Sequence, residues 1–132
     1  MFYEFHLTIP ANTSRDEPVT LAAPLAHAII VHVEVEFPPG CYGLAGVRVI
    51  EREHQIYPTN DDEWFISDAY VIRFTDVHYL YSPPFSLRIE GFNDDDTYQH
   101  RITLRFQLIH PEETLAKKIS DIFFGLETNP AE

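Results

Sequence analysis

Three consecutive aspartates, Asp94, Asp95 and Asp96, form the densest group of metal-ligand side chains in this sequence. Several carboxylate oxygens on one loop are the donor set that Ca²⁺ prefers. The spacing is not that of an EF-hand loop, however, and Asp and Asn side chains also bond their own backbone in tight turns. The run 93–97 is therefore interpreted first as a strand-to-strand turn, with these aspartates as weak Ca²⁺ candidates and no other cofactor predicted.

The seven histidines raise the question of a transition-metal site. Such sites place two histidines four residues apart on a helix, or two apart on a strand. No two histidines of this chain have either spacing, and the H-x-H-x-E motif of a metal-binding cupin barrel is absent. No metal ligand is predicted among them.

Nucleophilic catalysis has little support in the sequence. The single cysteine, Cys41, has no base near it in the chain and is interpreted as a small turn residue. No serine lies in a G-x-S-x-G elbow, and the five glycines form no loop that would cradle a phosphate. We therefore predict that the protein is not an enzyme and has no catalytic residues.

Aromatic residues make up 14% of the chain, and most rings in a β-sandwich fill the core. Trp64 follows the acidic run 60–63 and is the ring that we most expect to be exposed. Exposed Trp and Tyr rings stack on sugar faces. Trp64 is therefore a candidate ligand or interface residue, and a carbohydrate-binding β-sandwich module is the alternative function.

The formal net charge is -12, which repels phosphate backbones and excludes nucleic acid as an expected partner. No apolar run reaches the roughly 18 residues that a membrane helix needs, so no membrane partner is expected either. The first residues lack the basic and apolar regions of a signal peptide. These features predict a protein that is made in a cytoplasm and stays soluble, and a virus particle assembled there would leave the same trace in the sequence.

Apolar and polar residues alternate along most of the chain, which is the pattern of strands with one buried and one wet face. In the run 29–37, for example, Val33 and Val35 alternate with His32 and Glu34. About eight strands are predicted, near residues 2–9, 18–23, 27–37, 44–51, 65–74, 77–81, 85–92 and 98–109.

The connections between these strands are rich in Pro, Gly, Asn and Asp, and few of them have the length of a two-residue hairpin. Longer connections suit strands that cross between two sheets. We therefore predict an all-β fold: an antiparallel β-sandwich of the single jelly-roll type over 1–110, with an immunoglobulin-like sandwich as second choice.

The C-terminal region changes character. Pro111 suits the first turn of a helix, and Leu115, Ile119, Ile122 and Phe123 fall on one helical stripe. An amphipathic helix is predicted over 111–126, followed by a flexible tail over 127–132. The stripe either caps the protein's own sandwich or docks on another subunit, so these four residues are candidate interface residues.

Three stretches carry a resemblance to a known class of protein: the end of the first strand at 7–13, the turn 37–40, and the turn 91–97 before the last long strand. Together they resemble the small single-jelly-roll structural proteins of viruses and phages, which build or decorate icosahedral capsids. The resemblance covers about residues 2–109 and supplies no site residue. It implies a structural protein of the virion, assembled in the host cytoplasm, that forms homo-oligomers, with trimers favoured, and contacts other particle proteins.

Overall fold

The computed structural model describes residues 1–111, and the predicted helix and tail lie beyond them apart from Pro111. All regular elements of the described part are strands, and it contains no helix able to span a membrane. The strands are β1 (Phe2–Ile9), β2 (Val19–Pro24), β3 (Ile29–Phe37), β4 (Ala45–Glu51), β5 (His54–Tyr57), β6 (Phe65–Ile66), β7 (Tyr70–Tyr79), β8 (Ser86–Asn93) and β9 (His100–Ile109).

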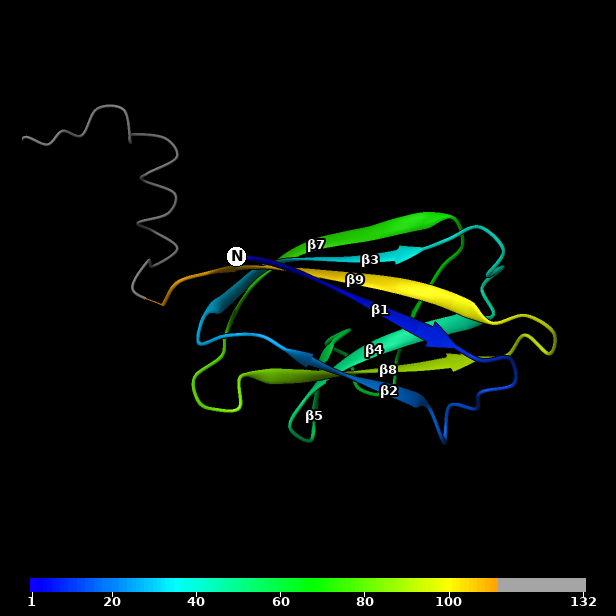
Figure 1. The fold of residues 1–132 in the computed structure, drawn as a ribbon, viewed down its shortest axis with the longest axis horizontal. Coiled ribbons are helices and arrows are strands. Elements are labelled where there is room, and N and C mark those ends of the chain that lie inside the picture. The colour runs from blue at the N-terminus through cyan, green and yellow to red at the C-terminus, as the bar shows by residue number, and fades with distance from the viewer. Residues whose placement is uncertain (112–132) are drawn as a thin grey trace, which may run out of the picture.

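The strands form two facing antiparallel sheets, as predicted (Figure 1). The first sheet has the order β1-β9-β3-β7, and the second has the order β2-β8-β4-β5, with β6 pairing β4 beside this path. From β1 to β4, and again from β7 to β9, each strand lies in the other sheet from the one before it. This interleaving, with the order β1-β9-β3-β7 in one sheet and β2-β8-β4-β5 in the other, is the jelly-roll arrangement, so the predicted fold class is confirmed.

The core lies between the sheets and is built by the alternation seen in the sequence. Val33 and Val35 of β3 and Leu104 of β9 point inward from the first sheet and are fully buried. Val49 of β4 and Ile89 of β8 meet them from the second sheet and are buried to the same extent. The polar residues between these positions therefore lie on the two outer faces.

Nine strands are present where about eight were predicted, and the differences fall between residues 52 and 81. The short strand β5 was missed, because its four residues follow a tight turn in which Arg52 has a φ of 59°. The predicted strands 65–74 and 77–81 are instead β6 and one long strand, β7. A bulge opposite Ile30 and His32 shifts the alternation of apolar and polar residues within β7. The sequence of this one strand therefore has the pattern of two shorter strands.

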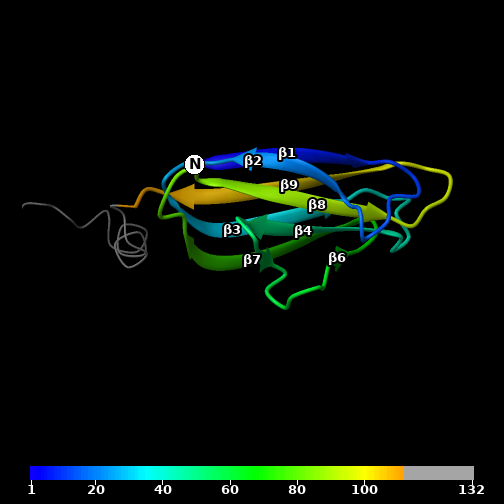
Figure 2. The same cartoon turned by 90° about the horizontal axis from the view of Figure 1, so that it is seen from below.

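The sandwich has two long sides, along which the edge strands of the two sheets lie. In Figure 2, β1 and β2 lie along one side, and β6 and β7 lie along the other. The first sheet ends at β7, which pairs only with β3. This edge of the first sheet therefore carries unpaired backbone groups that natural proteins must protect or use.

Candidate functional site

The outer face of the first sheet carries a row of alternating charges across all four strands. Strand register places Glu4 beside Arg105 and Glu34 beside Arg73, with Arg105 also beside Glu34. The three guanidinium nitrogens of Arg105 donate to Glu4 at 2.7 Å, Glu34 at 3.3 Å and Glu36 at 2.6 Å. Every donor nitrogen of Arg105 thus has a carboxylate partner within the protein.

These contacts also act on the acids of the row. The bond from Arg105 lowers the pKa of Glu4, and the bond with His32, at 3.1 Å, lowers the pKa of Glu34. The histidines His6 and His32 lie on this polar face, each beside a glutamate. The charged groups named here are paired with one another, so this face offers a ligand few unpaired hydrogen-bonding groups.

The aspartate run at 94–96 makes contacts that stabilise its own turn. Asp95 is buried, and its Oδ1 accepts the backbone N–H groups of Thr97 at 2.9 Å and Tyr98 at 3.1 Å. Its other oxygen lies 2.9 Å from Nε2 of His100. These hydrogen bonds, with that of Thr97 the largest cause, lower the pKa of Asp95.

The flanking aspartates are engaged as well. Asp94 lies 3.5 Å from Arg15, and Asp96 accepts the Thr97 hydroxyl at 2.8 Å. Within residues 1–111, no three His, Cys, Asp or Glu side chains are placed to hold a metal ion together. These contacts account for the run as a strand-to-strand turn, and the Ca²⁺ assignment stays a prediction.

Cys41 lies in the turn between β3 and β4 and is fully buried. Burial, followed by the charges of Asp68 and Asp95, raises the pKa of its thiol to about 11. At neutral pH the side chain is therefore a protonated thiol, which is a poor nucleophile. This is the behaviour expected of a small residue that fills a turn.

Trp64 packs on the outer face of the second sheet. Its ring meets the Phe92 ring edge-on at 4.9 Å, and the Arg48 guanidinium lies 4.2 Å from its centre. Phe92 is fully buried there because Gly46 leaves room for it and Arg15 covers its ring at 4.0 Å. These four side chains form one stack of two rings and two guanidinium groups.

The expectation that Trp64 is the most exposed ring is therefore wrong. It is half-buried, whereas the tyrosines Tyr42, Tyr70, Tyr81 and Tyr98 are each more than half exposed. The residue is held in place by packing on Phe92, which the sequence pattern does not reveal because Trp64 lies just before β6 and Phe92 lies on β8. The role of Trp64 as a ligand or interface residue remains a prediction.

Beside this stack, Glu90 joins two arginines on the same face. Only 7% of Glu90 is exposed, and its oxygens accept Nε of Arg48 at 2.8 Å and Nε of Arg88 at 2.9 Å. A buried carboxylate of this kind needs such partners. Both arginines bind Glu90 through Nε, so their terminal nitrogens are not used in these two hydrogen bonds.

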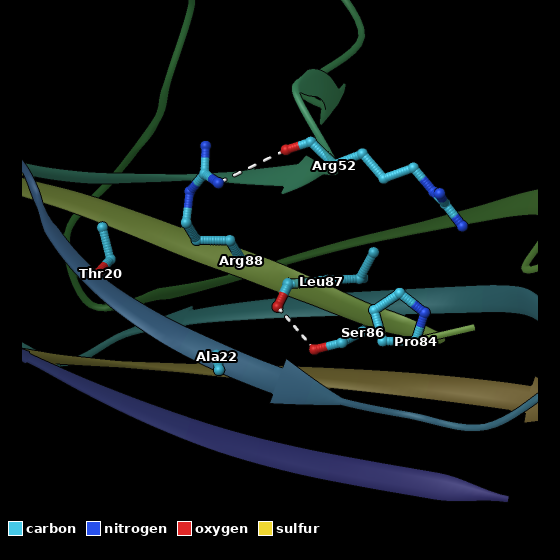
Figure 3. Close-up of a pocket in the computed structure, with 7 residues that line it drawn as sticks. All are labelled: Thr20, Ala22, Arg52, Pro84, Ser86, Leu87 and Arg88. Carbon is cyan, nitrogen blue, oxygen red and sulfur yellow. Dashed lines mark hydrogen bonds between the residues drawn. The ribbon is translucent and has the colours of Figure 1, made fainter. Parts of the chain in front are cut away.

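Two hollows flank Arg88 and together form what we call the outer-face trough. The first, of about 330 Å³, is shown in Figure 3 and is lined by Thr20, Ala22, Arg52, Pro84, Ser86, Leu87 and Arg88. The second, of about 350 Å³, has the Arg48–Glu90–Arg88 group and acidic residues of the β4–β5 turn and the 58–63 loop in its lining. Arg88 lines both hollows.

Gln55 of β5 holds the loop that borders the second hollow. Its amide nitrogen contacts the carbonyl oxygens of Pro58 at 2.8 Å, Asn60 at 3.2 Å and Glu63 at 3.0 Å. Within this loop Asp62 has a φ of 68°, a left-handed conformation that non-glycine residues rarely adopt. The loop is therefore fixed from inside, and it holds Asp61 and Asp62 at the border of the hollow.

Sequence reasoning missed the trough. Arg48, Arg88 and Glu90 look like ordinary polar positions of alternating strands, and Arg48 is 42 residues from Glu90. Only the β4–β8 register brings them together. A signal was present, since β8 carries Arg88 and Glu90 on one face, but it does not show that a third charge joins them.

A different, apolar hollow lies along the edge formed by β5, β6 and β7. We call it the edge groove; it has a volume of about 350 Å³ and is lined by Tyr57, Pro58, Thr59, Phe65, Ile72 and Phe74. Tyr57 closes its base by donating its hydroxyl to Asp76 at 2.7 Å. Burial, together with that carboxylate, raises the pKa of Tyr57, so the hydroxyl stays protonated.

No protein-family model matches the chain, and no curated protein matches its sequence. Among solved structures, it is similar to a chain from the X-ray structure of tomato aspermy virus, at 13% sequence identity. The similarity covers 86% of this chain and 81% of that chain, with a TM-score of 0.41. It is a weak resemblance to a viral protein, in keeping with the resemblance predicted from the sequence, and it concerns the fold alone.

Proposed function

We propose that this chain is a non-enzymatic structural protein of a virion, of the capsid or capsid-decorating kind, that acts through contacts between subunits. The jelly roll serves viral capsid proteins but also lectins and cupins, so the fold does not decide the function. The observation that carries the proposal is an apolar surface along the β7 edge.

This surface consists of the edge groove together with Tyr70 and Val77 of β7, and we call it the edge strip. Tyr70 is 61% exposed and Val77 is 56% exposed, which is high for side chains of this kind on a strand. The edge groove, which β7 also borders, contains the partly buried rings of Phe65 and Phe74. Exposed apolar side chains on a strand that also borders an apolar groove are typical of a protein–protein contact.

Charge favours a second copy of the chain as the occupant. Two copies of a protein with net charge -12 repel each other over most of their surfaces. The strand β7 contains one acid and one base, Asp76 and Arg73, so its own charges cancel. The edge strip is therefore a place where two copies approach with less repulsion. The resemblance described above favours a trimer and contacts with other particle proteins.

The predicted helix over 111–126 belongs to the same proposal. Its stripe of Leu115, Ile119, Ile122 and Phe123 needs an apolar surface, since a short amphipathic helix is marginal alone. We infer that it docks on a neighbouring subunit. The virion is the proposed location, with the host cytoplasm as the place of assembly.

The proposal is tested by the mass of the full chain in light scattering over a range of concentrations. We expect a closed homo-oligomer, and we expect Val77→Asp to reduce its mass toward that of a monomer because it adds a charge to the edge strip. Tyr98→Asp is the matched control, since Tyr98 is 68% exposed and lies in the β8–β9 connection. A wild-type chain that stays monomeric at every concentration would overturn the proposal.

A further inference from the structure

We propose that the outer-face trough binds a saccharide chain, with one sugar unit in each of its two hollows. The trough lies on the outer face of the second sheet and does not use the residues of the edge strip. The inference therefore stands independently of the assembly function.

The floor of the second hollow presents fixed hydrogen-bond donors. Glu90 holds Arg48 and Arg88 through their Nε atoms, and the Trp64 ring holds the Arg48 guanidinium from the other side. The terminal nitrogens of Arg48 make no hydrogen bond within the described residues, and those of Arg88 make one long contact, 3.5 Å to the Arg52 carbonyl (Figure 3). A guanidinium can only donate, so these groups require acceptors.

The border of the same hollow presents hydrogen-bond acceptors. Glu53, Asp61 and Asp62 line it, and none of their carboxylates forms an ion pair or side-chain hydrogen bond in the part of the chain that the structure describes. Ionised carboxylates can only accept. Gln55 bonds the backbone of the 58–63 loop, so the loop that carries the two aspartates has its shape before any ligand arrives.

This lining selects a neutral ligand whose groups both donate and accept. An anion would meet three carboxylates and a net charge of -12, and a cation would meet two guanidinium groups. An apolar ligand would bury charges without partners. Neighbouring hydroxyls of a sugar satisfy both sets, because each hydroxyl accepts from a guanidinium and donates to a carboxylate.

The first hollow explains why the ligand is a chain and not a single small molecule. Ala22 and Pro84 contribute apolar side chains to its lining, and hydroxyl-bearing Thr20 and Ser86 lie among them. A sugar ring has C–H faces that suit the apolar side chains and an edge of hydroxyls that suits the polar ones. Because Arg88 borders both hollows, one side chain can contact two linked units.

The single tryptophan makes the trough directly observable. Trp64 supports Arg48, and no other tryptophan is present, so the fluorescence of the whole protein at indole wavelengths reports on this face. The probes are glucose, galactose, mannose and N-acetylglucosamine, and the disaccharides maltose, cellobiose, lactose and chitobiose. Sodium acetate and glycine serve as anionic and zwitterionic probes, and calorimetry provides the second readout.

We expect at least one disaccharide to change the emission and to bind about tenfold tighter than its monosaccharide, which corresponds to about 1.4 kcal/mol. Arg88→Gln should weaken this binding by about tenfold or more, as for loss of hydrogen bonds to a charged group. Asp61→Asn, which removes no contact within the described residues, should weaken it as well. Arg73→Gln, on the other sheet, is the matched control and should bind as the wild type does.

Three results would overturn the proposal. The first is no binding of any saccharide at tens of millimolar by either readout. The second is binding of acetate or glycine alone. The third is saccharide binding that both Arg88→Gln and Asp61→Asn leave unchanged while circular dichroism shows them folded.

Discussion

At the scale of single residues, three carboxylates of this acidic protein, those of Glu4, Glu34 and Asp95, have pKa values that are lowered by partners within the fold. Asp95 is the best example, because two backbone N–H groups and His100 hold its ionised form inside the β8–β9 turn. Those contacts keep its pKa below the ordinary value of 3.8. A carboxyl group whose pKa falls on folding stabilises the fold when it is ionised.

The sign of this linkage gives a prediction. The contribution of Asp95 is present above pH 3.8 and is lost as the pH falls through the lower folded-state value. We expect Asp95→Asn to lower the melting temperature clearly at pH 7 and much less at pH 2.5. Asp94→Asn, which removes one exposed contact at 3.5 Å, is the control and should have a small effect at both pH values. Equal losses at both pH values for Asp95→Asn would show that the turn does not depend on the charge.

At the scale of elements, alternation was sufficient to place β1, β3 and β9 to within a residue or two at each end. It failed for β5, which is too short to show a period, and for β7, where a bulge interrupts it. Trp64 was singled out by its place after an acidic loop, yet Arg48, Arg88 and Glu90 were not. The register between strands that are distant in the chain decides which outer-face residues meet. The alternation of apolar and polar residues along one strand does not reveal that register.

The inward face of β3 supplies the prediction at this scale. Val33 is fully buried between Phe74 and Phe106, its partners on the two neighbouring strands. Val33→Asp places an unpaired charge in the core, which costs more than about 4 kcal/mol and approaches the whole stability of a small domain. We expect the variant to be unfolded by circular dichroism at 25 °C.

Thr75→Asp is the control for this substitution. Thr75 is exposed on the outer face of β7, opposite His32 of β3, so the same charge should be tolerated there. A Val33→Asp protein with the same melting temperature as the wild type would contradict the inward orientation of this side chain.

At the scale of the whole molecule, the described sandwich is complete before residue 110, with both sheets and the core in place. A chain that lacks residues 112–132 is therefore expected to fold and to melt cooperatively. If the segment docks on a neighbouring subunit, as we propose, the same deletion reduces the oligomer mass in light scattering. Aggregation of the shortened chain would instead indicate that the segment covers its own sandwich.

The strand order has one more consequence, for the time at which the fold can form. In the first sheet, β9 lies between β1 and β3, so the earliest strand of the chain has no hydrogen-bonded neighbour until the latest one has been synthesised. During translation β1 therefore has no strand partner in its sheet, whereas β3 can pair with β7 before β9 is made. Contacts between such distant positions form slowly, because a long loop must close before any of them can form. β1 is therefore expected to join its sheet only after β9 has been synthesised, and the negative charge of the chain favours its solubility until then.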